Sequence, residues 1–227
     1  MRISVVIPAR NEETFILGCL EAVIRQTLPP DEIIVVDNGS TDRTAELAQG
    51  MGVKLVNCPT PGVAVARQAG LEAATGDWVV TTDADSRPVV GWLEALRPHM
   101  AHSVALYGPL RMFGLPAWQE ELTELGYGVF LKMMMLLGKP NLAAANMAFH
   151  RQTALELGGY PMVEAREDVI LGWKLKAKGP VRYVREALVL TSARRVRGGW
   201  LRFLWQQARN LGGNSSGYFA ADEGKES

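Results

Sequence analysis

The first 85 residues alternate between short apolar runs and segments with helical periodicity, and this alternation constrains the fold more than any other feature. Apolar runs with the length and branched side chains of buried strands lie at residues 3–7, 33–36, 53–56 and 78–82. Helical spacing of apolar residues predicts helices between them, at residues 11–24, 40–49 and 62–74. Strands and helices that alternate in this way form parallel sheets with right-handed crossovers. We therefore predict an α/β fold, with a mixed, mostly parallel central sheet flanked by helices in a single domain.

The second half of the chain is less regular. Apolar runs predict strands, the last two as short edge strands, at residues 104–107, 142–149, 183 and 188–190. Helical spacing predicts a helix or helix pair over residues 118–138 and a further helix over residues 169–178. Residues 211–227 are rich in Gly and Ser and then acidic, which is typical of a flexible tail.

Charge and composition exclude several classes of protein. The chain has 24 Lys and Arg against 24 Asp and Glu, and this balance argues against nucleic-acid binding. Its two cysteines cannot by themselves form a disulfide framework or a four-ligand zinc site, and we expect a reducing compartment. The longest uncharged run, 98–110, is shorter than the roughly 20 apolar residues of a membrane span. With no signal-peptide pattern at the start, we expect a cytoplasmic location.

Polar clusters follow three of the predicted strands. They are residues 8–12, residues 37–40 and the D-x-D pair Asp83 and Asp85. Ligands of parallel sheets bind beyond the carboxyl ends of the strands, where these clusters lie. Two carboxylates spaced in this way can hold Mg²⁺ or Mn²⁺ with positions left for substrate phosphate, although D-x-D alone is also typical of a solvated turn. Residues 37–40 fit either a contact to a base or ribose or an Asx-turn. No G-x-G-x-x-G motif is present, which argues against a dinucleotide.

Four segments together resemble a known family of enzymes. They are, in chain order, VVIPARNEE, EIIVVDNGSTDRT, VAVARQAGLEAATGDWVVTTDAD and YPMVEAREDVILGWKLKAKG. Their order and spacing are similar to those of family 2 glycosyltransferases, which have the Rossmann-like GT-A fold. The resemblance implies transfer of a sugar from a nucleotide diphosphate donor, a UDP- or GDP-sugar, with inversion and with Mn²⁺ or Mg²⁺ as cofactor. It also implies one GT-A domain over residues 1–210, with a nucleotide-binding half (1–85) and an acceptor half (86–210).

The resemblance assigns roles to individual residues. The donor nucleotide would be contacted by Pro8, Ala9, Asn11, Glu12, Asp37, Arg67 and Asp83. The metal would be bound by Asp83 and Asp85, and the acceptor would lie near Asn146 and Glu167. The catalytic base would be Asp168.

The role of Asp168 can also be argued from chemistry. An inverting displacement needs one base to accept the proton of the acceptor hydroxyl, and one carboxylate suffices. Asp168 stands at the start of the predicted helix 169–178, where the helix dipole favours the ionised form. The alternative is that Glu167 and Asp168 only cap this helix.

A basic run near the end of the described motifs has two interpretations. Its residues Arg194, Arg195, Arg197 and Trp200 would close over the donor diphosphate, because the guanidinium fork matches phosphate oxygens. The run equally fits a solvated loop. The Q-x-x-R-W pattern of processive family members is missing, so we expect transfer of a single sugar.

Residues 125–139 are too short and too charged to span a membrane, yet their apolar side chains nearly surround the predicted helix. One expectation is that this helix is buried under the loop 194–200 or packs against a second subunit. In the second case the protein would be a homodimer. Alternatively, it lies at the inner face of the membrane, with Lys132 and Lys139 at the headgroups. The acceptor would then be lipid-linked rather than a small saccharide.

Two other functions compete with sugar transfer. A nucleotidyltransferase that makes a sugar nucleotide usually has a glycine-rich loop after the first strand, and residues 8–12 contain no glycine. A non-catalytic nucleotide-sugar-binding module would be expected to lack Asp85 or Asp168, and both are present.

Overall fold

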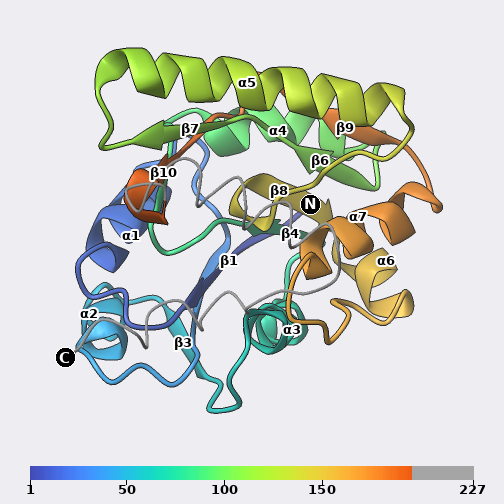
Figure 1. Cartoon of the computed structure of the whole chain (residues 1–227). Helices are drawn as coiled ribbons and strands as arrows, with labels where there is room; N and C mark the ends of the chain where they lie inside the picture. The colour runs from blue at the N-terminus through green and yellow to red at the C-terminus, as the bar shows by residue number, and fades with distance from the viewer. Residues whose placement is uncertain (196–227) are drawn as a thin grey trace.

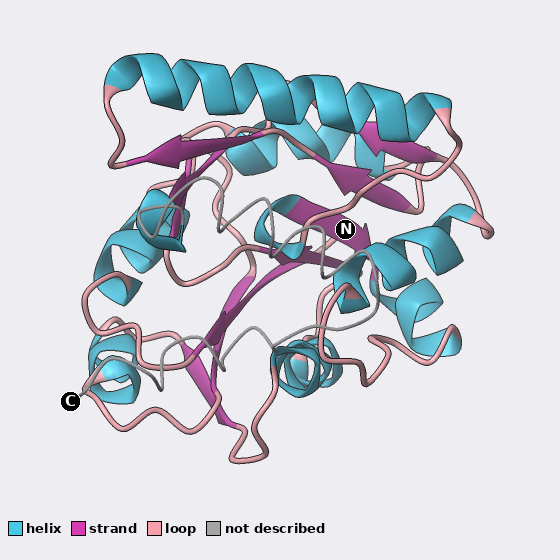
Figure 2. Cartoon of the chain, viewed as in Figure 1, coloured by secondary structure: helices cyan, strands magenta, loops and turns pink. Residues whose placement is uncertain are grey.

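A seven-stranded sheet runs through the centre of the computed structural model, which describes residues 1–195 (Figures 1 and 2). In spatial order its strands are β3 (Lys54–Asn57), β2 (Glu32–Asp37), β1 (Ile3–Ala9), β4 (Trp78–Thr81), β8 (Met147–His150), β6 (Ala105–Tyr107) and β9 (Val181–Tyr183). The first four are parallel, and β8 is antiparallel to both of its neighbours. The predicted mixed, mostly parallel sheet is therefore confirmed.

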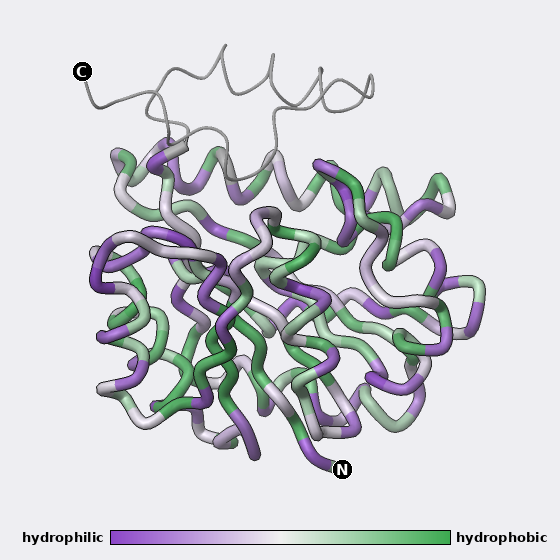
Figure 3. The backbone as a smooth tube through the Cα atoms, turned by 90° about the horizontal axis from the view of Figure 1, so that it is seen from below, coloured by the Kyte–Doolittle hydropathy of each residue, from purple (hydrophilic) through white to green (hydrophobic). Residues whose placement is uncertain are grey.

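Helices cover both faces of this sheet. The core on one face includes residues of α1 (Ile16–Ile24), α2 (Thr44–Gly50) and α4 (Trp92–Met100). The core on the other face includes residues of α3 (Val63–Ala73), α6 (Arg151–Glu156) and α7 (Glu167–Lys176). Strand β1 alternates between the two, with Val5 and Ile7 in the first core and Val6 in the second, as the period of a strand requires. In Figure 3 several apolar segments run through the middle of the molecule, and many hydrophilic segments lie at its outside.

A second, three-stranded sheet lies beside the first. Its order is β5 (Ser86–Pro88), β10 (Val189–Ser192) and β7 (Leu110–Phe113), and α5 (Ala117–Leu136) packs along β7 (Figure 1). The predicted edge strand at 188–190 is thus wrong, because β10 pairs on both sides. This pairing brings the end of β10 to the D-x-D motif, where the Ser192 amide donates to the Asp85 carbonyl at 3.1 Å.

Several predicted boundaries shift for a physical reason. The helix predicted from residue 11 begins at Ile16, and the one predicted from residue 40 begins at Thr44. In both cases the residues expected to cap the helix bind another loop instead. The strand predicted over 142–149 begins only at Met147, because residues Ala144–Asn146 form a 3-10 turn, η1. Segments β5, α4, β7 and α6 were not predicted.

Helix α5 has an apolar outer surface. Trp118 and Leu136 are 65% and 85% exposed, whereas Leu131 on the inner side is buried. The predicted helix over 118–138 is one continuous helix. Among the described residues, no helix combines the length and the hydropathy needed to cross a bilayer. The tail predicted over 211–227 lies outside the described residues.

Candidate active site

The loops that follow β1 and β2 are fastened to each other. The Asn11 amide oxygen accepts from the backbone N–H of Thr41 at 2.8 Å, and the Asn11 N–H donates to Ser40 Oγ at 3.0 Å. The Glu12 N–H donates to Thr44 Oγ1 at 2.7 Å. Asn11 has a left-handed backbone (φ 55°), a conformation that Asn adopts more readily than most residues. These bonds occupy the side chains that we expected to cap α1 and α2.

Asn38, the residue directly after β2, fixes the end of this strand through its side chain. Its amide donates to the carbonyls of Cys58 and Thr60 and its oxygen accepts from the Gly62 N–H, so it joins β2 to the start of α3. Asp37 is buried and accepts from the Ser40 N–H at 3.3 Å. This bond reaches the backbone three residues on, one residue further than in an Asx-turn, and a nucleotide contact by Asp37 stays a prediction.

Pro8 and Ala9 belong to a strand, not to the loop that we predicted to start at residue 8. They are the last two residues of buried strand β1, and the Ala9 carbonyl accepts from the Asn38 N–H at 2.8 Å. The loop beyond the strand therefore begins at Arg10. A donor contact by Pro8 or Ala9 stays a prediction.

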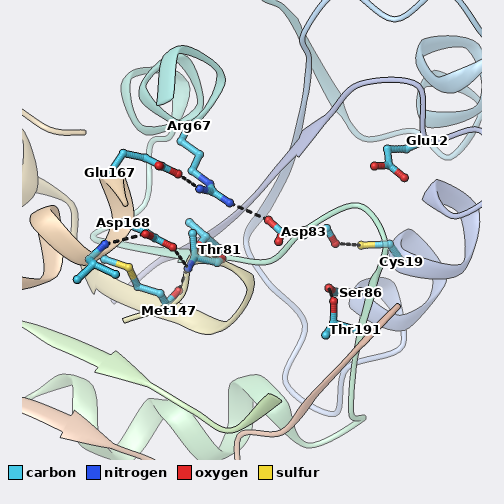
Figure 4. A network of polar contacts seen from close by, with 12 residues as sticks. Glu12, Cys19, Arg67, Thr81, Asp83, Ser86, Met147, Glu167, Asp168 and Thr191 are labelled. Atoms are coloured by element: carbon cyan, nitrogen blue, oxygen red, sulfur yellow. Dashed lines mark hydrogen bonds and ion pairs between the residues drawn. The ribbon is translucent and has the colours of Figure 1, made fainter. Parts of the chain in front are cut away.

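The two D-x-D carboxylates follow β4, and a third carboxylate, that of Glu12 in the loop between β1 and α1, lies near them. Burial raises the pKa of the Cys19 thiol, and the negative charges of Asp85, Asp83 and Glu12 raise it further. Cys19 also donates to the Asp83 carbonyl at 3.4 Å (Figure 4). All three carboxylates are thus close enough to act on one buried thiol, which places Glu12 with the D-x-D pair.

Arg67 joins the D-x-D motif to the start of α7. Its guanidinium, 3% exposed on α3, forms an ion pair with Asp83 at 2.9 Å and a second one with Glu167 (Figure 4). Burial raises the pKa of Glu167, and the charge of Arg67 acts in the opposite direction. The structure places Arg67 between two carboxylates rather than on an open surface. The position of Arg67 beside the nucleotide base stays a prediction.

Asp168 lies in the first turn of α7, next to Glu167 but with different partners. Its two carboxylate oxygens accept from the N–H groups of Ala144 (2.8 Å) and Val169 (2.7 Å) (Figure 4). It is half-buried. The preceding residue, Arg166, has a left-handed backbone (φ 68°) that turns the chain into the helix. The backbone N–H groups of Ala144 and Val169 thus fix the orientation of the Asp168 carboxylate.

Arg194 reaches the other side of the D-x-D motif from η2 (Ala193–Arg195). Its Nε lies 3.0 Å from Asp85 Oδ2, another guanidinium nitrogen pairs with Glu12, and the group lies over the Phe15 ring. The interpretation of this residue as part of a merely solvated loop is therefore wrong. The side chain of Arg195, and residues 197 and 200, lie outside the described part of the chain.

Asn146 is buried in the core. Its oxygen accepts from the Trp92 indole N–H at 2.9 Å, and its amide donates to the carbonyls of Pro109 and Ala187. An acceptor sugar could reach this amide only by displacing one of these bonds. The structure thus gives Asn146 a role in joining three segments of the core, which the sequence analysis missed. The predicted acceptor contact of Glu167 competes in the same way with its ion pair to Arg67.

The charges of the site suit a bound cation. Four carboxyl groups, those of Glu12, Asp83, Asp85 and Glu167, pair with the two guanidinium groups of Arg67 and Arg194, so acidic groups outnumber basic ones in this cluster. Within residues 1–195, no three His, Cys, Asp or Glu side chains gather to hold a metal by themselves. Mg²⁺ commonly binds through one or two carboxylates together with substrate phosphates. The Asp83–Asp85 pair fits that kind of shared site.

The chain is similar to known sugar transferases. The sequence model described as "Glycosyl transferase family 2" matches residues 4–156. The glycosyltransferase AglE of Haloferax volcanii is 31% identical over 169 residues, which are 70% of this chain and 56% of that protein. An uncharacterized glycosyltransferase of Escherichia coli, YibD, is 38% identical over 89 residues, 37% of this chain and 26% of that protein.

Solved structures share the fold. The mannosyltransferase PcManGT from Pyrobaculum calidifontis, in complex with GDP-Man and Mn²⁺, superposes with a TM-score of 0.72 at 23% identity, covering 93% of this chain and 62% of that one. S. aureus TarS 1–349 in complex with UDP-GlcNAc gives 0.65 at 20% identity, covering 86% and 59%. This chain therefore spans only about 60% of these neighbours. The predicted GT-A fold is confirmed, and the match of the family's sequence model to more than half of the chain shows that the protein belongs to glycosyl transferase family 2.

Proposed function

We propose that this chain transfers a single sugar from a UDP- or GDP-sugar to an acceptor hydroxyl, with inversion at the anomeric carbon. One observation carries the proposal: Arg67 bonds both Asp83 and Glu167, so the D-x-D motif and the helix that bears Asp168 meet at one edge of the sheet. A donor held at Asp83 then presents its anomeric carbon toward Asp168. Two structural neighbours, in complex with UDP-GlcNAc and with GDP-Man and Mn²⁺, support the choice of donor class.

The named side chains divide the reaction between them. Asp83 and Asp85 would hold a divalent cation, which supplies positive charge to the departing diphosphate. Asp168 accepts the proton of the acceptor hydroxyl at a carboxylate oxygen. The acceptor oxygen forms its bond to the anomeric carbon while the bond from that carbon to the phosphate oxygen breaks. The products are the glycosylated acceptor, a nucleoside diphosphate and a protonated Asp168.

Replacing Asp85 by Asn should remove metal-dependent binding of the nucleotide. The variant loses one of two anionic cation ligands but keeps a side chain of the same size at the end of a loop. Calorimetric titration with UDP and with GDP, each with and without Mn²⁺, should show metal-dependent affinity in the wild type alone. Equal Mn²⁺-dependent affinity in a folded Asp85→Asn protein would remove Asp85 from the metal site.

We also propose that the outer face of α5 contacts the inner leaflet of the membrane and that the acceptor is lipid-linked. Exposed apolar side chains recur on this helix at a spacing of three or four and form one stripe: Trp118, Leu122, Leu125, Val129, Met133 and Leu136. A helix of 20 residues is about 30 Å long, so the stripe is longer than the scattered apolar residues of an ordinary surface. Lys132 and Lys139 are exposed and can reach anionic headgroups.

Flotation with liposomes that contain anionic lipid tests this contact. The wild type should float. The double variant Leu125→Glu with Leu136→Glu should stay with the unbound protein, because moving the two new carboxylates into the lipid costs free energy. Ile24→Glu with Val90→Glu adds the same charge at exposed apolar positions away from α5 and should still float. A wild type that does not float at low salt contradicts the membrane contact. A dimer that the α5 variant dissociates would make α5 a subunit interface instead.

A further inference from the structure

Arg194 is held by three groups from separate parts of the fold. Its guanidinium pairs with Asp85 after β4 and with Glu12 after β1, and it lies 5.0 Å from the centre of the Phe15 ring in front of α1. The two carboxylates are buried, and the Arg194 side chain itself is 26% exposed. The guanidinium group of Arg194 therefore occupies the space next to Asp85, the second carboxylate of the D-x-D motif.

Each D-x-D carboxylate thus has its own arginine, and the two arginines differ in how firmly they are fixed. Arg67 projects from the middle of α3, is almost fully buried and also pairs with Glu167. Arg194 projects from a three-residue turn directly after β10, tied locally by its N–H to Ser192 Oγ at 3.3 Å. Arg194 can leave its two carboxylates by a rotation of a side chain that is 26% exposed, whereas Arg67 is held inside a helix with a side chain that is only 4% exposed.

We propose that Arg194 and the divalent cation compete for Asp85, so that metal binding releases Arg194. The inference rests on the proposed role of Asp85 as a metal ligand. Two cations at one buried carboxylate repel each other strongly, because the surrounding protein screens them poorly. The cation therefore displaces the guanidinium from Asp85 and Glu12.

The released guanidinium has a natural new partner. A nucleotide diphosphate at the D-x-D motif brings phosphate oxygens that match the planar fork of Arg194. The metal alone then binds weakly, because it must displace Arg194 without compensation. The metal and the diphosphate together bind strongly, because the diphosphate takes up the displaced guanidinium. The exchange makes the binding of the two ligands mutually dependent.

Arg194→Met tests the exchange through metal affinity, measured by calorimetry or Mn²⁺ EPR without any nucleotide. Removing the competitor should tighten Mn²⁺ binding at least about fivefold, since the apparent dissociation constant varies inversely with the fraction of protein that is competent to bind. The same variant should bind UDP or GDP in the presence of Mn²⁺ more weakly than the wild type. Arg111→Met removes an arginine that pairs with Glu124 on α5, and it should change neither affinity.

Phe15→Leu separates the exchange from a simple change in charge. The substitution removes the ring on which the guanidinium lies but alters no charge near the metal. It should tighten Mn²⁺ binding about two- to fivefold, the effect of losing one exposed cation–π contact. Unchanged Mn²⁺ affinity in Phe15→Leu overturns the exchange, because any effect of Arg194→Met would then be electrostatic only. If thermal unfolding shows that Arg194→Met does not fold, Phe15→Leu decides alone.

The Asp85→Asn protein distinguishes this inference from the proposed function. Wild-type Mn²⁺ binding that disappears in Asp85→Asn, with tighter binding in Arg194→Met and Phe15→Leu, supports both. Loss in Asp85→Asn with unchanged affinity in the other two variants overturns the exchange and keeps the metal site. Mn²⁺ binding that survives in Asp85→Asn overturns both.

Discussion

Replacing Asp168 by Asn should lower the rate of sugar transfer by a factor on the order of 10² to 10⁴, which is the usual contribution of a general base. The amide keeps the size of the side chain but cannot accept the proton of the acceptor hydroxyl. Donor affinity should stay near that of the wild type, because Asp168 bonds Ala144 and Val169 rather than the D-x-D motif. Release of nucleoside diphosphate from the donor measures the rate, and calorimetry measures donor binding.

A matched control for this variant lies at the opposite end of β4. Asp77→Asn makes the same chemical change at an exposed residue that accepts from the Arg2 N–H, and it should leave the rate unchanged. Transfer by a folded Asp168→Asn protein at a rate close to the wild type would return Asp168 to the role of a helix cap. A parallel loss of donor affinity would likewise contradict its assignment as the base.

Replacing Arg67 by Met should destabilise the fold by about 3–5 kcal/mol, the usual cost of leaving a buried charge without its partner. Two carboxylates, the partly buried Asp83 and the buried Glu167, pair with this guanidinium. Urea denaturation measures the free energy of unfolding. The deficit should shrink at acidic pH, because burial raises the pKa of Glu167 and protonation then removes the unpaired charge of this carboxyl group.

Two further proteins check the cause of this loss. Arg43→Met removes an exposed arginine whose pair with Glu46 lies on the surface, and such pairs contribute about 1 kcal/mol or less. Adding Glu167→Gln to Arg67→Met should recover part of the lost stability, because one unpaired charge disappears. A loss below about 1 kcal/mol in Arg67→Met would show that Asp83 and Glu167 do not depend on the guanidinium.

The parallel half of the fold could be predicted from the sequence because its signals are local. Strands β1, β2 and β4 are apolar runs that are buried on both faces and end in polar loops, so the sequence pattern alone places them. The second sheet could not be predicted in this way. Strand β10 pairs with β5 and β7, which lie far from it in the sequence, and no pattern in residues 189–192 predicts which strands these residues pair with.

The candidate site shows the same division. The D-x-D pair and Asp168 follow from short motifs, whereas the arginines that organise them depend on tertiary pairing. Arg67 meets Glu167 across 100 positions of the chain, and Arg194 meets Glu12 across 182. Asn146 shows a second limit of the sequence. A polar residue in the presumed acceptor region can have its hydrogen bonds inside the core, as the buried amide of Asn146 does.

Proton NMR of the first sugar product tests the central claim most directly. The wild type, its Asp85→Asn variant and its Asp168→Asn variant are each incubated with an α-linked UDP- or GDP-sugar and Mn²⁺, with a lipid-linked saccharide and, separately, a simple saccharide as acceptor. The account predicts that the wild type alone consumes a donor at a substantial rate and that the newly formed product carries the β configuration. A product that first appears in the α configuration, or consumption that persists in both variants, would contradict inverting transfer by the D-x-D motif and Asp168.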